Sequence, residues 1–325
     1  MNSFRSPCKE LIAEKARSLG IEKTGVAAVM PVSSGAVEMY DRWIASGRHG
    51  EMAYLERYGE VRANPSLLLP SARSIICCAV NYFPSRKQCP DAPQIASYAL
   101  GCDYHDVVRE KLEALAAFIR ENFGGETRVC VDTAPVRERY WAVQSGLGFV
   151  GKNNQLIIPG KGSYFFLGEI IATHEIEPDE PCRLSCGDCG ACLRVCPSGA
   201  LMPDGGIDAR RCLSYLTIEY RGDLPPGVPL GNRLYGCDSC QAACPHNRHA
   251  SATNVEEFAP SERLLNLSCE AIENMSQQEF SALFRHSAIK RTKLSGLQRN
   301  AMYIRRAQKG SLPEDAPHDA RSRLR

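Results

Sequence analysis

Two runs of cysteine stand out among the 16 cysteines of this 325-residue chain, because their spacing suits metal binding. The first run reads Cys-x-x-Cys-x-x-Cys-x-x-x-Cys-Pro and consists of Cys186, Cys189, Cys192 and Cys196 before Pro197. The second has Cys237, Cys240 and Cys244 before Pro245, and Cys212 upstream makes an eighth thiolate. Two-residue gaps let three thiolates of one loop face a single inorganic cluster. The sequence therefore predicts iron–sulfur chemistry.

The two runs predict a crossed set of ligands, because the fourth cysteine of such a run binds the other cluster. One [4Fe-4S] cluster is expected on Cys186, Cys189, Cys192 and Cys244, and the second on Cys196, Cys212, Cys237 and Cys240. Cys182 competes with Cys212 but lies outside the register. The alternative is a pair of zinc ribbons, although zinc ligands usually come as two separated Cys-x-x-Cys pairs.

The other seven cysteines are expected to be small buried side chains. They are Cys8, Cys77, Cys78, Cys89, Cys102, Cys130 and Cys269. Two adjacent clusters conduct electrons but offer no obvious place for a substrate. We therefore expect a reductase that takes electrons from an external ferredoxin or flavodoxin and delivers them to a cofactor in another domain.

A chain of this length can bury real cores, so disulfides are not needed for folding. The N-terminus lacks the apolar core of a signal peptide. The longest apolar stretches, over 75–80 and 164–167, fall far short of the roughly 20 residues that span a bilayer. We expect a cytoplasmic protein without a membrane segment, in which the thiols stay reduced.

The charge is nearly balanced overall, with 39 Lys and Arg against 37 Asp and Glu, but it is unevenly placed. Residues 283–325 hold 11 Lys and Arg against 3 Asp and Glu, a net charge of +8, and residues 1–282 carry −6. A basic end on an acidic body is typical of proteins that bind nucleic acid. A solvated tail would show the same pattern.

Periodicity and turn residues predict three domains, the first of which alternates helices and strands. Helices are expected over 8–19, 36–46, 105–123 and 136–146, and strands over 24–30, 74–82, 127–132 and 163–172. After a proline-bounded linker, residues 182–244 are dense in Cys, Gly and Pro, and helices return over 269–275, 277–285 and 294–307. We predict a catalytic domain over 1–178, a cluster module over 179–258 and a basic helical region over 259–325.

Neither a dinucleotide-binding fingerprint nor a phosphate-binding loop occurs, which disfavours a nicotinamide or nucleoside-triphosphate enzyme. Polar groups gather instead in three segments, around Asp103 and His105, at Asp132, and at Lys152 and Asn153. Asp132 ends a predicted strand, a place where ligands bind in α/β sheets. Each group also has a structural reading, since Asp103, His105 and Asp132 could cap helices.

This combination resembles the epoxyqueuosine reductase family, cobalamin-dependent iron–sulfur enzymes that act on tRNA. The stretches that carry the resemblance are 51–57, 98–105, 131–139, 151–153, 162–171 and 208–219, together with both cysteine runs. The resemblance implies a nitroreductase-like α+β domain that holds cob(II)alamin, a ferredoxin-like module with two [4Fe-4S] clusters that reduces it, and a helical C-terminal region that helps to hold tRNA. Two electrons and two protons would convert the epoxide on the modified wobble base to an alkene, with release of water.

The resemblance also implies roles for residues of the first domain. Asp132 is the expected proton donor, and a carboxyl group that gives up a proton near neutral pH must be kept protonated by burial or by negative neighbours. Contacts to the corrin are expected from Arg57, Ser97, Asp132, Arg139, Lys152, Asn153 and Ser163.

Partners of the C-terminal part follow from the same resemblance. The groups that would attract tRNA phosphates are Lys290, Arg291, Lys293, Arg299, Arg305 and Arg306. Tyr215, Tyr220 and Tyr235 would either stack on a splayed base or belong to the core. We expect the protein to act as a monomer.

Two alternatives have other functions. A reductive dehalogenase combines cobalamin with two clusters in the same way, but such enzymes typically carry a twin-arginine export signal, which is missing from this sequence. A ferredoxin-type electron-transfer protein would have no chemistry of its own and would need no cobalamin.

Overall fold

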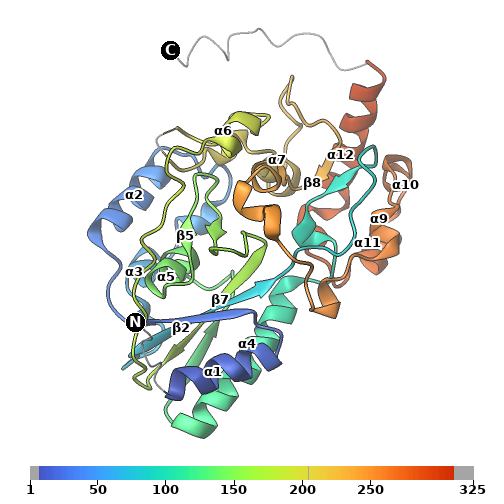
Figure 1. Cartoon of the computed structure of the whole chain (residues 1–325). Helices are drawn as coiled ribbons and strands as arrows, with labels where there is room; N and C mark the ends of the chain where they lie inside the picture. Colours follow the sequence, from blue (N-terminus) through green and yellow to red (C-terminus); the bar gives the residue numbers. More distant parts are fainter. Residues whose placement is uncertain (1–6, 204, 311–325) are drawn as a thin grey trace.

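The computed structural model describes residues 7–203 and 205–310 (Figure 1). Its centre is a four-stranded sheet of β1 (Lys23–Ala28), β2 (Ser74–Asn81), β7 (Phe165–Ala172) and β4 (Thr127–Cys130). The strand order is β1-β2-β7-β4, and every neighbouring pair is antiparallel. All eight residues of β2 are buried, as expected for a strand with both faces covered. The predicted mixture of helix and sheet is therefore confirmed.

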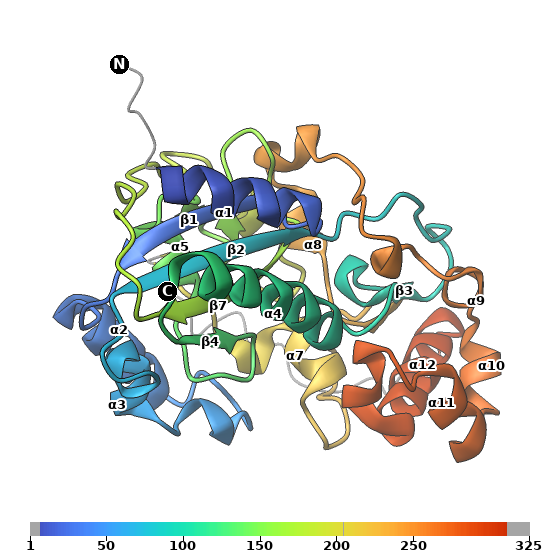
Figure 2. The ribbon, with the colours of Figure 1, turned by 90° about the horizontal axis from the view of Figure 1, so that it is seen from below.

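Helices cover both faces of the sheet (Figure 2). On one face, α1 (Pro7–Ser18) and α4 (Tyr104–Phe123) pack together, and α4 buries Val108, Leu112, Leu115 and Ile119 at helical spacing. On the other face, α5 (Glu138–Gln144) buries Trp141, and α2 (Ser34–Ala45) lies farther out. All the helices and strands that the sequence predicts are confirmed, and their ends differ by at most two residues.

Short elements connect this sheet to the rest of the chain. Between α2 and α4 they are η1 (Ala53–Leu55), α3 (Gly59–Ala63), η2 (Pro65–Leu67), β3 (Gln94–Ile95) and η3 (Ser97–Ala99). A small hairpin of β5 (Phe149–Val150) and β6 (Leu156–Ile157) follows α5. The cysteine-rich part contains α6 (Ala191–Val195), η4 (Ala209–Arg211), α7 (Leu213–Ile218), β8 (Arg233–Tyr235), α8 (Ser239–Ala242) and η5 (Pro245–His249).

The described C-terminal part is built from helices. They are η6 (Glu256–Phe258), α9 (Glu262–Leu265), α10 (Cys269–Glu273), α11 (Gln277–Leu283), η7 (Ala288–Thr292) and α12 (Lys293–Gln308). The remainder of the basic end, residues 311–325, lies outside the described residues. No helix within 7–203 or 205–310 is long and apolar enough to cross a membrane.

One hydrophobic core joins segments from all three predicted domains. It packs Ala99 and Leu100 of the first domain against Leu213 and Leu234 of the cysteine-rich part and Ile304 of α12. β3 also pairs in parallel with β8. The cores are therefore shared across the predicted boundaries after residues 178 and 258, and the C-terminal helices are fixed to the body by burial.

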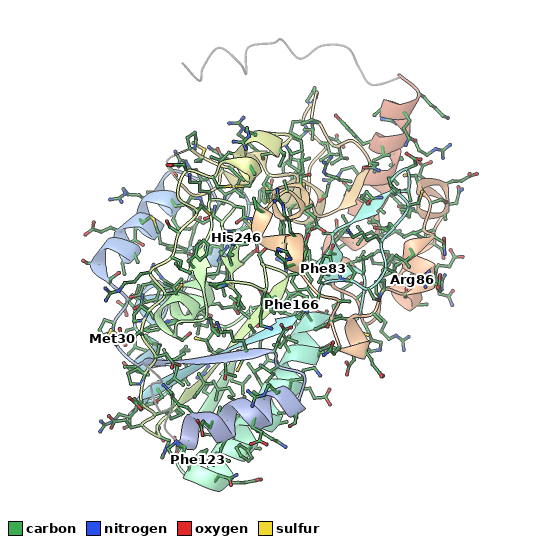
Figure 3. All side chains as sticks on the ribbon, viewed as in Figure 1. Met30, Phe83, Arg86, Phe123, Phe166 and His246 are labelled. Atoms are coloured by element: carbon green, nitrogen blue, oxygen red, sulfur yellow. The ribbon has the colours of Figure 1, made fainter. Side chains whose placement is uncertain are left out.

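Phe166, near the start of β7, connects this strand to α4 and η6. Its ring stacks on Tyr104 of α4 at 4.4 Å between centroids and lies 4.9 Å from Phe258 of η6. Figure 3 places Phe166 toward the middle of the molecule, whereas Met30 and Arg86 lie at its edges. Aromatic packing thus holds α4 and η6 against the start of β7.

The prediction that the seven other cysteines are buried is wrong at two positions. Cys77, Cys78, Cys130 and Cys269 are buried and Cys8 is half-buried, but Cys89 and Cys102 are exposed. Both exposed cysteines lie in connecting segments, which run over the surface because their backbone polar groups need water.

Glu169 is an ionisable group in the middle of β7. It is fully buried, and neither carboxylate oxygen has a hydrogen-bond partner within the described part of the chain. Burial, together with the nearby Glu138 carboxylate, raises the pKa of Glu169 well above its ordinary value. The folded protein therefore holds a proton here that the unfolded chain releases above its ordinary pKa of 4.5.

Because folding retains this proton, stability should fall as the pH rises above about 5, by up to about 1.4 kcal/mol per pH unit for one group. We expect Glu169→Gln to flatten this fall, since glutamine does not titrate. The measurement is the thermal midpoint from pH 5 to pH 8, with Glu121→Gln on the exposed face of α4 as the matched control. A Glu169→Gln protein with the wild-type pH dependence would contradict the assignment.

Candidate functional site

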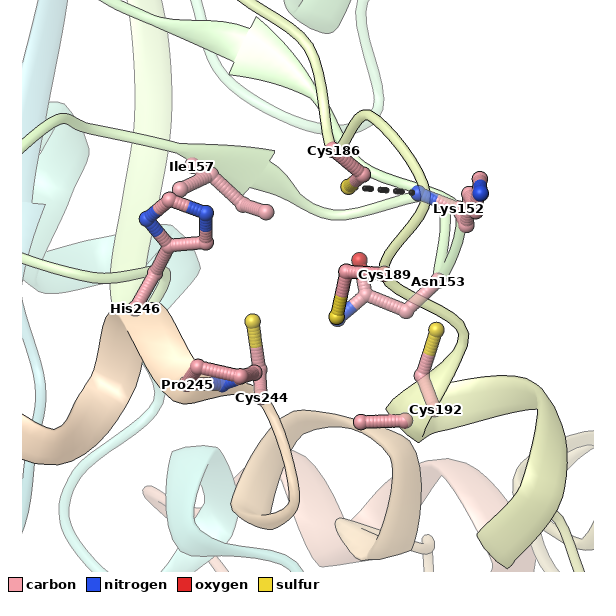
Figure 4. Close-up of a pocket in the computed structure, with 10 residues that line it drawn as sticks. Lys152, Asn153, Ile157, Cys186, Cys189, Cys192, Cys244, Pro245 and His246 are labelled. Carbon is pink, nitrogen blue, oxygen red and sulfur yellow. Dashed lines mark hydrogen bonds between the residues drawn. The ribbon is translucent and has the colours of Figure 1, made fainter.

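The first predicted set of cysteines surrounds one cavity (Figure 4). Cys186, Cys189, Cys192 and Cys244 line it, together with Lys152, Asn153, Ile157, Ala191, Pro245 and His246. Three of the thiols come from the loop before α6 and from α6 itself, and the fourth comes from the residue before η5. The Cys-x-x-Cys gaps place neighbouring thiols of the loop on the same side, as a cluster requires.

Hydrogen-bond donors surround the thiols of this cavity. The backbone N–H of Lys152 donates to Cys186 Sγ at 3.5 Å, and Lys152 Nζ donates to the carbonyl of Gly187 at 2.8 Å. A cationic side chain and an N–H group next to the sulfurs stabilise negative charge, which a thiolate-bound cluster carries.

The second predicted set also gathers in one place. Burial raises the pKa of the Cys240 thiol to about 12, and nearby Cys237, Cys212 and Cys196 add to the rise. The pKa of Cys196 itself is lowered, because backbone N–H groups of Leu201 and Ala200 outweigh its burial. The eight predicted cysteines thus form two neighbouring groups, and α6 packs against α8 between them.

The thiols stand around a space and do not converge on a point. Within 7–203 and 205–310, no group of three or more His, Cys, Asp and Glu is arranged to hold a single metal ion. The spacing of the first run favours clusters over zinc ribbons, whose ligands usually come as two separated Cys-x-x-Cys pairs.

Asp132 lies beyond the end of β4 in a conformation that is rare for a residue with a side chain. Its φ angle is +46°, and its side chain is 48% exposed. The backbone N–H of Asp132 donates to Glu138 Oε1 at 2.7 Å, which fixes this turn from the start of α5. Because a left-handed residue costs about 1–2 kcal/mol, the carboxylate of Glu138 stabilises a strained segment.

A line of alternating charges runs from Asp132 to the C-terminal helices. Asp132 Oδ2 lies 2.8 Å from His105 Nε2, and His105 Nδ1 lies 2.7 Å from Asp103 Oδ1. The other oxygen of Asp103 pairs with Lys290 Nζ of η7 at 2.8 Å. The sequence predicts capping roles for Asp103 and His105, and Asp103 does cap α4 by accepting the N–H of His105. Sequence alone does not reveal the pairing with Asp132.

These contacts set the charge states of the site. Burial alone would lower the pKa of His105, but Asp103 and Asp132 outweigh it and raise that pKa to about 9. Burial would raise the pKa of Asp103, but His105 and Lys290 lower it overall. Burial, and then the charge of Asp132, raises the pKa of Glu138 to about 7. At neutral pH, His105 is thus a cation between two carboxylates.

Aromatic and basic groups border the same face. The guanidinium of Arg291 lies 5.5 Å from the ring centroid of Tyr54. Burial, the carboxylate of Glu219 and, more weakly, that of Asp132 raise the pKa of Tyr54 to about 12, so Tyr54 faces both acidic groups. Arg57 and Arg139 are exposed, and the Arg139 guanidinium donates to the carbonyl of Asn154.

The other predicted corrin contacts lie next to the cysteines. Lys152 and Asn153 line the first cavity, and the Ser97 N–H donates to Asp238 Oδ2 at 2.7 Å. Ser163 is buried, and its N–H donates to Asn247 Oδ1 at 2.7 Å. These four residues connect the sheet domain to the cysteine-rich part, and their contact with a corrin stays a prediction.

Four of the six basic residues predicted to attract phosphates have partners in the fold. Lys290 pairs with Asp103, Arg291 with Glu219 and Arg305 with Glu273, and Arg299 donates to the carbonyls of Leu216, Tyr220 and Gly222. Lys293 and Arg306 are exposed. Tyr215 and Tyr235 are buried in the shared core, as the structural reading of these tyrosines predicts.

Comparison with known proteins shows which family the chain belongs to. Residues 62–133 match the family model "Epoxyqueuosine reductase QueG, DUF1730", and residues 185–247 match "4Fe-4S double cluster binding domain". The epoxyqueuosine reductase of Leadbetterella byssophila is 37% identical over 308 residues, which cover 94% of this chain and 99% of the relative. The chain belongs to the epoxyqueuosine reductase family.

Solved structures of this family have the same fold. An epoxyqueuosine reductase crystallised with an epoxyqueuosine-modified tRNA-Tyr stem loop has a TM-score of 0.81 at 35% identity, covering 91% of this chain and 80% of that one. The enzyme from Bacillus subtilis, solved with its catalytic aspartate loop swung out of the active site, has a TM-score of 0.79 at 34% identity with the same coverage. Family membership leaves the dehalogenase and ferredoxin-type alternatives without support.

The bond from Asp132 to Glu138 generates a prediction about the turn after β4. At about pH 8, above the raised pKa of about 7 of Glu138, we expect Glu138→Ala to raise the hydrogen-exchange rate of the Asp132 amide at least about tenfold, because losing a hydrogen bond to a charged acceptor costs roughly 1.5–3 kcal/mol. Glu138→Gln keeps an oxygen acceptor and should retain most of the protection. Equal exchange in all three proteins would show that Glu138 does not hold the turn.

Proposed function

We propose that this protein reduces epoxyqueuosine to queuosine at the wobble position of tRNA. The proposal rests on the family of the chain and on the two groups of four thiols. Above all it rests on one observation: an exposed aspartate, Asp132, is held by Glu138 and His105 beyond the end of β4. A carboxylate fixed in this way can act on a bound substrate while the clusters stay separate from it.

The two clusters are proposed on the crossed ligand sets. Cys186, Cys189, Cys192 and Cys244 would hold one [4Fe-4S] cluster, and Cys196, Cys212, Cys237 and Cys240 the other. An external ferredoxin or flavodoxin would supply the electrons. The cavity lined by the first set, with Lys152 beside it, supports this assignment.

Cob(II)alamin is proposed as the cofactor of the sheet domain, in a nitroreductase-like arrangement. The residues around Asp132 fit such a group in chemical type, because Tyr54 and Tyr58 are 43% and 65% exposed and could cover an apolar corrin face. The exposed guanidinium groups of Arg57 and Arg139 suit its amide fringe and phosphate. When bound, the cobalamin would supply reducing electrons to the epoxide.

Asp132 would give a proton to the oxygen that leaves the epoxide carbon. The catalytic aspartate loop named for the Bacillus subtilis relative supports this role. The helical C-terminal region, which reaches the Asp132 face through Lys290 and Arg291, would help to hold the tRNA. The enzyme would act as a monomer in the cytoplasm, where its tRNA substrate is found.

The direct test is nucleoside mass spectrometry. The anaerobically reconstituted protein, with cobalamin and a strong reductant, is incubated with a stem loop that carries epoxyqueuosine. We expect queuosine to form only when cobalamin is present. A cluster-replete, cobalamin-bound protein that forms no queuosine would overturn the proposed function.

The role of Asp132 leads to a kinetic prediction. Asp132→Asn should slow single-turnover reduction by about 10²–10⁴-fold, the usual contribution of a positioned acid, without loss of bound cobalamin. Asp106→Asn, at an exposed position of α4, is the matched control and should react at the wild-type rate. Full activity of Asp132→Asn would remove Asp132 as the proton donor.

The crossed ligand sets predict iron contents. Cys244→Ser and Cys240→Ser should each lower the reconstituted iron from about eight to about four atoms per chain, because each change affects a different cluster. Cys182→Ser should keep the full content, since Cys182 lies outside both sets. If Cys182→Ser lost four iron atoms, or either ligand variant lost none, the ligand sets would need to be reassigned.

A further inference from the structure

Asp132 receives a hydrogen bond from a histidine that is itself held by a buried carboxylate. The three side chains form the sequence Asp103, His105, Asp132, with nitrogen–oxygen distances of 2.7 and 2.8 Å. The side chain of Asp103 is 4% exposed, that of His105 is 32% exposed and that of Asp132 is 48% exposed. The line therefore runs from the protein interior to the open face of the site.

We propose, on the basis of the function above, that His105 is a positioning residue which holds the proton that Asp132 passes to the departing epoxide oxygen, and that Asp103 fixes the orientation of its ring. His105 acts through Asp132, so it needs no contact with the substrate. Asp132 then relays a proton to the departing oxygen, and the imidazole of His105 is the source of that proton.

Several contacts hold the imidazole in place. Its ring stacks on Tyr104 at 4.1 Å between centroids, and Tyr104 stacks in turn on Phe166. Asp103 is fixed by Lys290 Nζ at 2.8 Å, and its backbone N–H donates to the carbonyl of His286 at 2.7 Å. A ring with both nitrogens bonded to carboxylates cannot turn without breaking one of these bonds, so Nε2 stays directed at Asp132.

The charges that face His105 favour its protonated form. They come from Asp103 on its own helix, from Asp132 after β4 and from Glu138 on α5. Tyr104 is neutral at the relevant pH, because burial raises its pKa. The cation of Lys290 acts on His105 only through Asp103. With two carboxylates in contact, the imidazole carries a proton at neutral pH.

The proposed step is balanced in protons and electrons. The N–H bond at His105 Nε2 breaks and an O–H bond forms at Asp132 Oδ2; that O–H bond then breaks as a new one forms on the oxygen leaving the epoxide carbon. Cobalamin, when bound, would supply the two electrons of the reduction. His105 is left neutral with its Nδ1–H on Asp103, and water can reprotonate it from its exposed side. A second transfer along the same route supplies the second proton, so that the oxygen leaves as water after two electrons and two protons in total.

The test is the pH profile of single-turnover queuosine formation by the holoenzyme. For the wild type we expect the rate to fall above pH 9, where His105 loses its proton, since its pKa is raised to about 9. His105→Gln keeps an N–H donor toward Asp132 but cannot hold a transferable proton. We expect it to react about 100-fold more slowly and to lose the fall at pH 9. His174→Gln, at the far end of β7 beside Phe123, is the matched control and should keep both the rate and the profile.

Asp103→Asn gives a second, independent measurement. Asparagine caps a helix as well as aspartate does, so α4 should stay intact. Loss of one carboxylate should move the alkaline fall of the rate to lower pH by at least about one unit. Iron content, cobalamin binding and stem-loop affinity are measured for every variant, so that a folding defect is recognised. If His105→Gln does not fold, the pH profile of Asp103→Asn decides whether the proposal holds.

Two results would overturn the proposal. One is His105→Gln with a rate within twofold of the wild type; the other is a slower His105→Gln that keeps the wild-type fall near pH 9, which would mean that histidine only orients Asp132. Failure of the proposed function would appear differently, because the wild type itself would then form no queuosine.

Discussion

Much of the arrangement of this molecule depends on the contact between the two cysteine runs, because Cys244 of the second run lines the same cavity as Cys186, Cys189 and Cys192 of the first. It requires residues 186–196 and 237–244 to lie side by side, although about forty residues separate them. The chain between the two cysteine runs must therefore form a loop whose two ends lie next to each other. Few of its residues are in regular elements, so the loop gains stability from its neighbours and, with the proposed clusters bound, from metal ligation. Its apolar side chains, such as Leu213, Leu216 and Leu234, are buried against the C-terminal helices and not in a core of their own.

The same constraint explains why buried polar groups connect this loop to the sheet. Gln241, between Cys240 and Cys244, donates to Tyr82 Oη at 3.0 Å and to the carbonyl of Ser163 at 2.9 Å. Asn247, just after Cys244, bonds Ser163 from the other side. These groups are almost fully satisfied, and satisfied polar networks specify one orientation more sharply than apolar contact does. The two groups of thiols are in this way held at a fixed place relative to the sheet domain and Asp132.

Elements with a strong local pattern could be predicted from the sequence, whereas the relations between them could not. α4 follows from the spacing of Val108, Leu112, Leu115 and Ile119, and β2 from an unbroken apolar run. The cysteine sets follow from short gaps in the chain. The pairing of His105 with Asp132 depends on where α4 crosses the sheet, which no local pattern contains. The rule for strand ends in parallel sheets pointed to Asp132, yet this sheet is antiparallel. Asp132 is at the site because β4 ends opposite Glu169 in the middle of β7 and the chain continues toward the start of that strand, where Phe166 packs on Tyr104.

The uneven charge of the chain does not mean that all of its basic C-terminal residues are free to bind nucleic acid. A basic end of +8 on a body of −6 suggested a free arm for nucleic acid, but Lys290, Arg291 and Arg305 are paired with acidic groups of the fold. Exposed ion pairs contribute little each, whereas the Lys290 pair reaches a buried carboxylate and so has more effect. Since that carboxylate, Asp103, is also bonded to His105, the basic segment helps to set the electrostatics of the site directly. In the proposed mechanism, a tRNA phosphate that drew Lys290 away would leave the charge of Asp103 less compensated, and His105 would then hold its proton more strongly. The proposed mechanism therefore couples substrate binding to proton supply through one buried aspartate.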